Sequence, residues 1–582
     1  MRIKHFFGLA VIAAMTASCS SNNDLVVGGG NGSGENESGV SYASFSINLP
    51  TTSGTRADAN PEFKPGDANE YDVFNATLLV FKKPTAATAA TSEGEYTFVE
   101  HVDLGSMQPW KSSSETGVTT QAKITAKLSK VDKSGEYFAL VLLNNGSGAD
   151  AKVNLPTDEP TTTYSAWNKA ANATDKFDKT DKGFYMANAP LFKNNSVTTL
   201  VAIDNSKIFP TEAQASSGEA AADIYVERGL AKVTLTEDTK AEKTVGDGSS
   251  YAGDVVTINN WALDVTNKKT FPIHNVDGLS TDYENIWKND ETATAAPSTQ
   301  RFVDNSKAIA KRVYWGTDPN YKETNLSAET KESKDAREKN FNYIKKENLT
   351  AKPTDPLYCL ENTFNVANML QEQTTRVVFK GTYTPKSITA DANGTFYKIG
   401  KNVALWNSED LKKHIVAAVT KVVDGASAAG TTINVDLDAT DNKLTVAGNR
   451  LLDKKNISVN GIELTQPQVD AVNEKLGLSK GYGISTYEKG ESYYIARIKH
   501  FGDALTPWNP GEAYNGDNLK YLGRYGMLRN NWYELNVQSV SGPGYPDVPD
   551  VKPNTPDDEI DKYIKVSVNI LHWAKRSQDV NL

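Results

Sequence analysis

Two short segments, one near each end of the chain, alternate strictly between apolar and polar residues. The apolar positions of the first segment are Ala43, Phe45, Ile47 and Leu49. Those of the second segment are Ile564, Val566, Val568 and Ile570. A period of two is typical of a β-strand with one buried face. Each end of the chain is therefore predicted to carry a strand with the same kind of apolar face.

Short strands are also predicted along most of the chain between these ends. They are marked by apolar, β-branched and aromatic residues between turn-forming residues. The predicted strands cover residues 76–82, 96–104, 122–128, 137–143, 224–226, 231–235, 260–265, 376–383, 493–498 and 532–537. Residues 137–143 are apolar on both faces and lead into Asn144-Asn-Gly146, so this strand is expected between two layers, with a turn after it.

Helices are predicted in only three places. Residues 408–423 carry apolar side chains at helical spacing, with Ser408 as the expected N-cap. Residues 465–476 are expected to begin at the cap Thr465, and residues 165–171 form a short third helix. Many strands with few helices favour an all-β fold of β-sandwich domains with short helical insertions.

Changes in composition divide the chain into successive parts. A polar stretch with Gly246 and Gly248 follows the strand at 231–235 and predicts a boundary between two β-domains. The proline-rich residues 541–556 cannot form a central strand and predict an extended linker. The expected parts are a signal peptide at 1–19, a propeptide with a tether at 20–56, an N-terminal β-sandwich at 57–240, a C-terminal β-sandwich with a helical insertion at 250–540, and a linker with the terminal strand at 541–582.

The linker leaves two positions open for the terminal strand. From residue 540 to residue 562 the chain could reach roughly 70 Å at about 3.3 Å per residue, enough to cross onto a neighbouring molecule. The strand would then complete a sheet in another copy. Alternatively it folds back onto its own domain as an edge strand, and the sequence supports both arrangements equally.

The first residues have the pattern of an export signal that ends in a lipid-attachment cysteine. Arg2 and Lys4 precede an apolar stretch, residues 6–15, that is too short to span a bilayer comfortably. Small residues lead to Cys19, which is predicted to be acylated. Because the third residue before Cys19 is a threonine, the alternative is an ordinary secretory signal. The glycine-rich residues 28–34 predict a flexible tether.

Composition argues against several classes of function. A net charge of −10 is unlike that of a nucleic-acid-binding protein. Once Cys19 is acylated, Cys359 has no partner for an intrachain disulfide. The six histidines lack metal-binding spacing, and neither a nucleophile elbow nor a phosphate-binding loop is present, so no catalytic residue, metal site or cofactor is predicted. Asp436, Asp438 and Asp441 depart from the calcium-loop pattern and are expected in a hairpin turn instead.

The two ends of the chain resemble those of a known family, the fimbrillins of the Bacteroidales type V pilus, and in particular the shaft subunits of the short, or minor, fimbria. The resemblance rests on the leader with Cys19, residues 44–50 followed by Arg56 and Ala57, residues 226–233, residues 528–537, and the linker with the terminal strand up to residue 573. Residues 387–490 take no part in it.

The resemblance implies a fold and a way of assembling. The fold is all-β, with two transthyretin-like β-sandwich domains and an extended C-terminal donor strand. An arginine-specific surface protease cuts between Arg56 and Ala57, which removes the lipidated segment together with the strand at 43–49. The C-terminal strand of the next copy then enters the vacated groove, and a head-to-tail fibre grows. The precursor is an outer-membrane lipoprotein, and the mature protein lies in an extracellular fimbria that supports adhesion.

The same resemblance implies further partners: accessory anchor and tip pilins, and ligands on host or bacterial surfaces. Both end features are present here, which favours a shaft subunit over a tip or anchor pilin. The strongest alternative is a surface lipoprotein that does not polymerise, binds glycans or a host protein, and keeps its terminal strand at home. No enzymatic activity is expected in either case.

Overall fold

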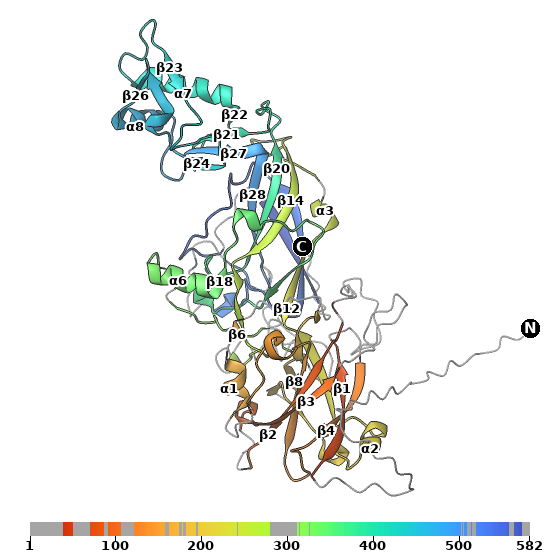
Figure 1. Ribbon diagram of the computed structural model, residues 1–582. Coiled ribbons are helices and arrows are strands. Elements are labelled where there is room, and N and C mark those ends of the chain that lie inside the picture. Colours follow the sequence, from red (N-terminus) through yellow and green to blue (C-terminus); the bar gives the residue numbers. More distant parts are fainter. Residues whose placement is uncertain are drawn as a thin grey trace, which may run out of the picture.

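The computed structural model describes residues 39–49, 70–105, 121–279, 311–557 and 564–572, with gaps at 71, 86–90, 158–161, 171, 174–176, 178–181, 194–195, 241, 314, 325, 327, 502, 504–505, 509–511, 513 and 515–518. Three parts follow one another along an elongated molecule: an N-terminal domain, a middle domain and a small distal module (Figure 1). The fold is all-β with a few short helices, as predicted. No helix within these described ranges is long and apolar enough to cross a membrane.

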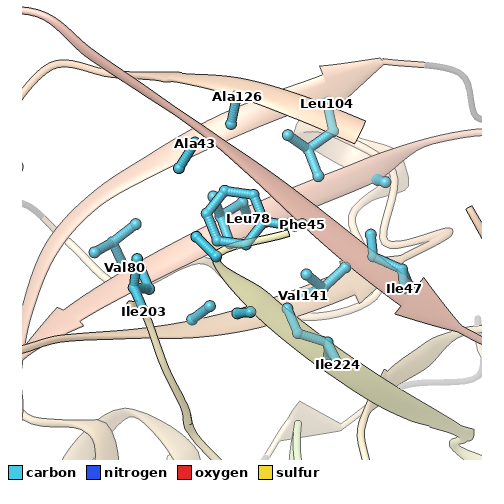
Figure 2. Close-up of a cluster of buried hydrophobic side chains, with 14 of the residues drawn as sticks. Ala43, Phe45, Ile47, Leu78, Val80, Leu104, Ala126, Val141, Ile203 and Ile224 are labelled. Carbon is cyan, nitrogen blue, oxygen red and sulfur yellow. The ribbon is translucent and has the colours of Figure 1, made fainter. Parts of the chain in front are cut away.

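The N-terminal domain is built on one eight-stranded sheet with the order β3-β2-β5-β7-β11-β1-β4, and β10 pairs with β5. The strands are β1 (Ser41–Asn48), β2 (Ala76–Lys82), β3 (Thr97–Gly105), β4 (Gln121–Leu128), β5 (Tyr137–Leu143), β7 (Met186–Asn188), β10 (Val201–Ala202) and β11 (Ala222–Arg228). Alternate residues of these strands point into one apolar cluster, in which Phe45 lies among Leu78, Val80 and Val141 (Figure 2). The first predicted strand therefore lies inside this sheet, not at its edge.

The middle domain pairs two four-stranded sheets. One has the order β19-β12-β29-β30, and its strands are β12 (Leu230–Leu235), β19 (Leu357–Leu360), β29 (Asn531–Val540) and β30 (Ile564–His572). The other has the order β13-β14-β20-β28, and its strands are β13 (Lys243–Thr244), β14 (Val255–Asp264), β20 (Arg376–Thr384) and β28 (Glu491–Arg497). Val233 and Leu535 of the first sheet share one buried cluster with Phe379 and Tyr494 of the second, as in a β-sandwich.

The chain passes from the N-terminal to the middle domain at Gly229, between β11 and β12. The backbone N–H of Gly229 donates to Tyr185 O at 2.9 Å. A side chain at Gly229 would meet the rings of Phe177 and Tyr185 at less than 3 Å, so only glycine fits here. The polar stretch after residue 235, which predicted a domain boundary, thus lies within the middle domain. The actual boundary between the domains has no sequence signal, because a single glycine separates the strand that ends one domain from the strand that begins the next.

The distal module, residues 396–487, is inserted between the paired strands β20 and β28 and has its own apolar cluster. Its strands are β21 (Phe396–Ile399), β22 (Leu405–Trp406), β23 (Ile433–Val435), β24 (Gly448–Arg450), β25 (Ile457–Val459), β26 (Ile462–Glu463) and β27 (Ile484–Tyr487). The predicted turn around Asp436, Asp438 and Asp441 is present: the Leu444 N–H donates to Leu437 O at 2.7 Å, and the Asn442 N–H donates to Ala439 O at 3.0 Å. The strand β23 pairs with β25, and β24 pairs with β27.

All three predicted helices are present: α1 (Tyr164–Lys169), α7 (Ser408–Val422) and α8 (Gln466–Lys475). The N-cap of α7 is Asn407, not the predicted Ser408. Asn407 Oδ1 accepts from the Asp410 N–H at 2.8 Å, whereas the Ser408 hydroxyl donates to Asp391. Thr465 caps α8 as predicted.

The described chain also has short 3-10 helices and these further short α-helices and strands: α2 (Glu212–Ser217), α3 (Glu237–Lys240), α6 (Lys331–Asn340), β6 (Asn172–Ala173), β8 (Leu191–Lys193), β9 (Ser196–Thr198), β15 (Thr266–Asn267), β16 (Lys269–Thr270), β17 (Lys311–Arg312) and β18 (Phe341–Asn342). The helix α6 was not predicted because its sequence is almost entirely polar. It is held by a cap, in which Thr330 Oγ1 accepts from the Ser333 N–H, and by Arg337, which donates to Ala328 O at 2.9 Å.

Candidate assembly site

The strand β1 is paired along both of its edges. It runs parallel to β11, with Phe45 opposite Ala222, and antiparallel to β4, with Phe45 opposite Ile124. The side chains of Ala43, Phe45 and Ile47 are 0% exposed. Leu49, just after the strand, is 3% exposed. Removal of β1 would therefore leave an apolar trough, with one unpaired strand edge on each side.

The opposite face of β1 makes specific polar contacts. The Ser44 hydroxyl donates to Ala215 O at 2.6 Å, beneath the short helix α2, and lies 2.9 Å from Thr125 Oγ1. The Asn48 amide donates to Asp223 Oδ1 at 2.5 Å and to Ile224 O at 3.2 Å. Ser44 is fully buried, whereas Asn48 is half-buried and Asp223 is exposed. The polar position of Ser44, at one end of the trough, is thus closed to solvent. The polar position of Asn48, at the other end, is open to solvent and lies beside the carboxylate of Asp223.

The terminal strand β30 lies in its own middle domain, antiparallel to β29 at the edge of the sheet. Val566 and Val568 are half-buried and pack against the cluster of the middle domain. The backbone of Ile564 pairs with Val540, and that of Ile570 pairs with Tyr533. The strand β30 is thus folded back onto its own domain, which is one of the two arrangements that the sequence allows. In this arrangement its described residues are paired along only one edge.

The proline-rich linker is fastened to the middle domain and does not form a free tether. The backbone groups of Tyr545 and Tyr493 exchange two hydrogen bonds of 2.8 and 2.9 Å. The Arg376 guanidinium donates to Pro549 O at 2.6 Å, and the buried Asp557 accepts from Thr374 Oγ1 at 2.6 Å. In this conformation the linker is therefore not extended over its possible reach of roughly 70 Å at about 3.3 Å per residue. The six residues between Asp557 and β30 span at most roughly 20 Å at about 3.3 Å each.

The chain downstream of the predicted cleavage point is fixed at the junction of the two domains through Glu70. Glu70 Oε1 lies 2.6 Å from Lys232 Nζ, with both side chains buried, and accepts from the Tyr358 hydroxyl at 2.7 Å. The Arg228 guanidinium donates to the backbone O of Glu70, and Lys232 Nζ lies 4.1 Å from the centre of the Trp532 ring. Glu70 thereby ties this segment directly to β11, β12 and β19, and Lys232 extends the contact to β29.

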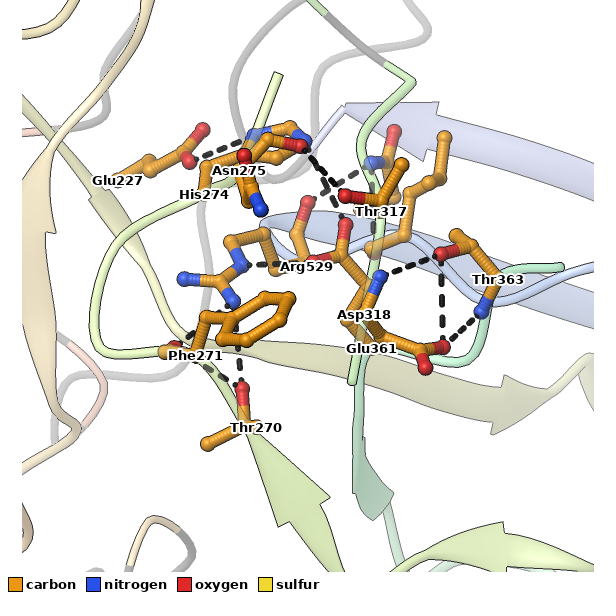
Figure 3. Close-up of polar contacts among 12 residues, drawn as sticks. Glu227, Thr270, Phe271, His274, Asn275, Thr317, Asp318, Glu361, Thr363 and Arg529 are labelled. Atoms are coloured by element: carbon orange, nitrogen blue, oxygen red, sulfur yellow. Dashed lines mark hydrogen bonds and ion pairs between the residues drawn. The ribbon is translucent and has the colours of Figure 1, made fainter. Parts of the chain in front are cut away.

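A second buried polar network joins the two domains nearby (Figure 3). His274 Nδ1 lies 2.9 Å from Glu227 of β11, and His274 Nε2 lies 3.5 Å from Glu361. Arg529, just before β29, lies 3.1 Å from the other oxygen of Glu361. Asp318 accepts from the backbone N–H groups of Asn320 and Thr363. Since buried charges need partners, this network fixes how the two domains meet.

Burial raises the pKa of Asp318 to about 7, although the backbone hydrogen bonds favour the charged form. Because the pKa in the folded state is above the unfolded value of about 3.9, this carboxyl stabilises the fold most below pH 4, and its contribution is lost as the pH rises through 7. Between pH 5 and pH 8 the loss amounts to roughly 2–3 kcal/mol.

We expect Asp318→Asn to remove that part of the pH dependence while it keeps one acceptor oxygen. The free energy of unfolding, measured in urea at pH 5 and pH 8, should differ less between the two pH values in the variant than in the unmutated protein. Asp557 and Glu93 have pKa values raised in the same direction by burial, so the variant should keep part of the pH dependence. An unchanged difference between pH 5 and pH 8 would contradict this role of Asp318.

Three of the predicted site residues, Cys19, Arg56 and Ala57, lie outside the described residues, so lipidation and cleavage stay predictions. Cys359 is buried, and burial raises the pKa of its thiol to about 12, which leaves it unreactive. Glu70 is a residue that the sequence analysis did not single out. No local pattern marks it, because its partners are distant in sequence.

The C-terminal part of the chain matches a known family. Residues 485–579 match the family model described as major fimbrial subunit protein type IV, fimbrillin, C-terminal. No protein with curated annotation matches the chain.

Two solved structures from Parabacteroides distasonis are distantly similar. One, described as a candidate cell adhesion protein, has 11% identity and a TM-score of 0.37, with 92% of this chain and 98% of that chain covered. The other, a fimbrial assembly protein, has 14% identity and a TM-score of 0.21, with 40% of this chain and 65% of that chain covered. These likenesses are too weak to carry an argument. The family match agrees with a resemblance to the fimbrillins over its own range: residues 485–579, which include β28, β29 and β30, are similar to the C-terminal region of that family.

Proposed function

We propose that this chain is the structural shaft subunit of a surface fimbria. It is exported as an outer-membrane lipoprotein acylated at Cys19, matured by an arginine-specific protease between Arg56 and Ala57, and polymerised by donor-strand exchange. The mature protein lies in an extracellular fimbria, together with accessory anchor and tip pilins, and the fibre supports adhesion to host or bacterial surfaces. The role is structural and not catalytic.

One observation carries the proposal: β1 is an internal strand that lies upstream of the predicted cut, whereas β30 is an edge strand of similar pattern. On one side of β1, β11 is also paired with β7; on the other side, β4 ends the described sheet and is held at α2, where Lys123 Nζ donates to Ser216 O at 2.8 Å. Glu70 fixes the chain downstream of Arg56. A cut after Arg56 therefore separates β1 covalently from the domain that it completes. This arrangement supports loss of β1 without loss of the remaining fold.

The energetics favour transfer of β30 into the vacated trough. At home β30 pairs along one edge, and its described side chains Val566 and Val568 are half-buried. In the trough it would pair along both edges, and each added backbone hydrogen bond contributes about 0.5–1.5 kcal/mol. Full burial of four aliphatic side chains contributes roughly 6–12 kcal/mol in total before the entropy of ordering is subtracted. A head-to-tail contact of this kind does not close on itself, so it yields a fibre.

The test is to cut the purified precursor with an arginine-specific protease and to run it unboiled in SDS, with sequencing of the new N-terminus. We expect a ladder of multimers that begin at Ala57. Arg56→Ala should give an uncut monomer. A chain without residues 560–582 should be cut normally and remain a monomer. A cut wild type that remains a monomer, or a ladder from the chain without residues 560–582, would overturn donor-strand exchange.

A second candidate function is a surface lipoprotein that binds glycans or a host protein and does not polymerise. The home position of β30 favours it, since the isolated chain already pairs this strand. This alternative predicts a single monomer band after cleavage at Ala57, together with measurable affinity for a sugar or a host protein.

A further inference from the structure

We propose that the terminal strand enters the trough of the next copy in the direction opposite to β1, antiparallel to β11 and parallel to β4, so that Lys565 lies beside Asp223. The partner is a second copy of this chain, and the orientation is fixed by one charged side chain. This inference rests on the proposed function, because it concerns the strand that replaces β1.

The apolar faces of the two strands do not decide the direction. The four apolar positions of 43–49 and the four of 564–570 are symmetric about the central serines, Ser46 and Ser567. Either direction places an aliphatic side chain at each apolar position of the trough and Ser567 at the position of Ser46. The outer polar residues, Lys565 and Asn569, are the ones that differ between the two directions.

In the direction of β1, Lys565 would take the place of Ser44. That position is 0% exposed, lies beneath α2, and offers a backbone carbonyl at Ala215 and the hydroxyl of Thr125. None of these groups carries a negative charge. Burial of an ammonium group without a counter-ion costs several kcal/mol, which would offset much of the gain from the apolar face. In this direction Asn569 would take the place of Asn48 and restore its hydrogen bonds, but these stabilise the complex far less than the buried ammonium group destabilises it.

In the opposite direction, Lys565 takes the place of Asn48 and Asn569 that of Ser44. The Asn48 position is half-buried, and its side-chain amide lies 2.5 Å from the carboxylate of Asp223. An ammonium group there keeps contact with water and gains a counter-ion. At the closed end, the neutral amide of Asn569 can donate to Ala215 O and accept from Thr125. The side chains at both outer polar positions, Lys565 and Asn569, then have partners of suitable charge or hydrogen-bonding capacity.

The same contacts select a single register. A shift of two residues one way would place Lys565 at the position of Ser46, which is 8% exposed. A shift of two residues the other way would place Leu571 against Ala215 O in place of Asn569, and would leave this carbonyl unpaired. A shift of one residue would turn the apolar face outward. The arrangement with Lys565 beside Asp223 therefore avoids a buried charge, an unpaired carbonyl and an exposed apolar face.

Disulfide trapping in the cut full-length precursor tests the direction. In the proposed direction residue 565 lies opposite Gln121, since Gln121 is the partner of Asn48 on β4; in the direction of β1 it lies opposite Thr125, the partner of Ser44. Directly opposite residues in a sheet are close enough for a disulfide. We expect the variant Lys565→Cys with Gln121→Cys to form boiling-resistant multimers that a reductant dissolves, and Lys565→Cys with Thr125→Cys to form at least roughly tenfold fewer.

A charge exchange provides the second measurement. Asp223→Lys or Lys565→Asp alone should slow assembly at low salt, and the double variant should restore it, because the two charges attract again. Preferential cross-linking through Thr125, or an equally strong ladder without cross-linking at either pair, would overturn the direction while donor-strand exchange stands. A wild-type chain without any ladder would instead overturn the proposed function.

Discussion

Val568→Asp is expected to abolish fibre assembly and to leave the monomer folded. At home Val568 is half-buried on an edge strand, so a carboxylate there can turn toward water. In the trough the same residue takes the place of Phe45 or Ile47, whichever way the strand runs, and both positions are 0% exposed. An unpaired buried carboxylate costs several kcal/mol, which removes most of the gain from strand transfer.

The measurement for Val568→Asp is the unboiled ladder after cleavage, with circular dichroism of the uncut precursor as the test of folding. Val568→Ile is the matched control, because it keeps the apolar character and should assemble. A normal ladder from Val568→Asp would show that the terminal strand does not enter the trough.

Phe45→Ala is expected to destabilise the precursor and to leave the mature fibre unaffected. In the precursor Phe45 fills the centre of the N-terminal cluster, so its truncation should lower the free energy of unfolding by about 3–5 kcal/mol. In the mature fibre the strand that carried Phe45 has left, so the cut variant should assemble and resist SDS like the unmutated protein.

Urea unfolding of the uncut precursor and the ladder after cleavage give the two readouts for Phe45→Ala. Leu78→Ala is the control: this residue lies in the same cluster but stays after cleavage, so it should weaken both precursor and fibre. A loss of fibre stability in Phe45→Ala as large as that in the precursor would mean that β1 remains in the assembled subunit.

The strands could be predicted from the sequence because their signal is local. Short runs of apolar, β-branched and aromatic residues that end at turn-forming residues are enough to locate β2 and β5 to the residue. The helix α6 could not be found in this way, since it has no apolar stripe and is held by the cap at Thr330 and the bonds of Arg337. Likewise, the choice of β25 as the partner of β23 depends on contacts between distant segments.

At the candidate site, too, the features with a local sequence signal could be predicted, and those that depend on distant contacts could not. The sequence located both end strands and their apolar faces, and it left open whether β30 lies at the edge of its own sheet or in another copy. It gave no sign that Tyr545 and Asp557 fasten the linker to the middle domain, because their bonds have no sequence pattern. Glu70 remained hidden for the same reason, since its partner Lys232 lies on a strand of the next domain.

The position of the distal module bears on how this protein could diversify. Thr382 of β20 and Glu491 of β28 are direct partners in the sheet, so the two chain ends that lead to the module lie about 5 Å apart. A short hairpin turn could join them in its place, and the module has an apolar core of its own. Related chains could thus lose the module, exchange it or vary its surface without altering either sheet. The same junction would accept a foreign domain in its place.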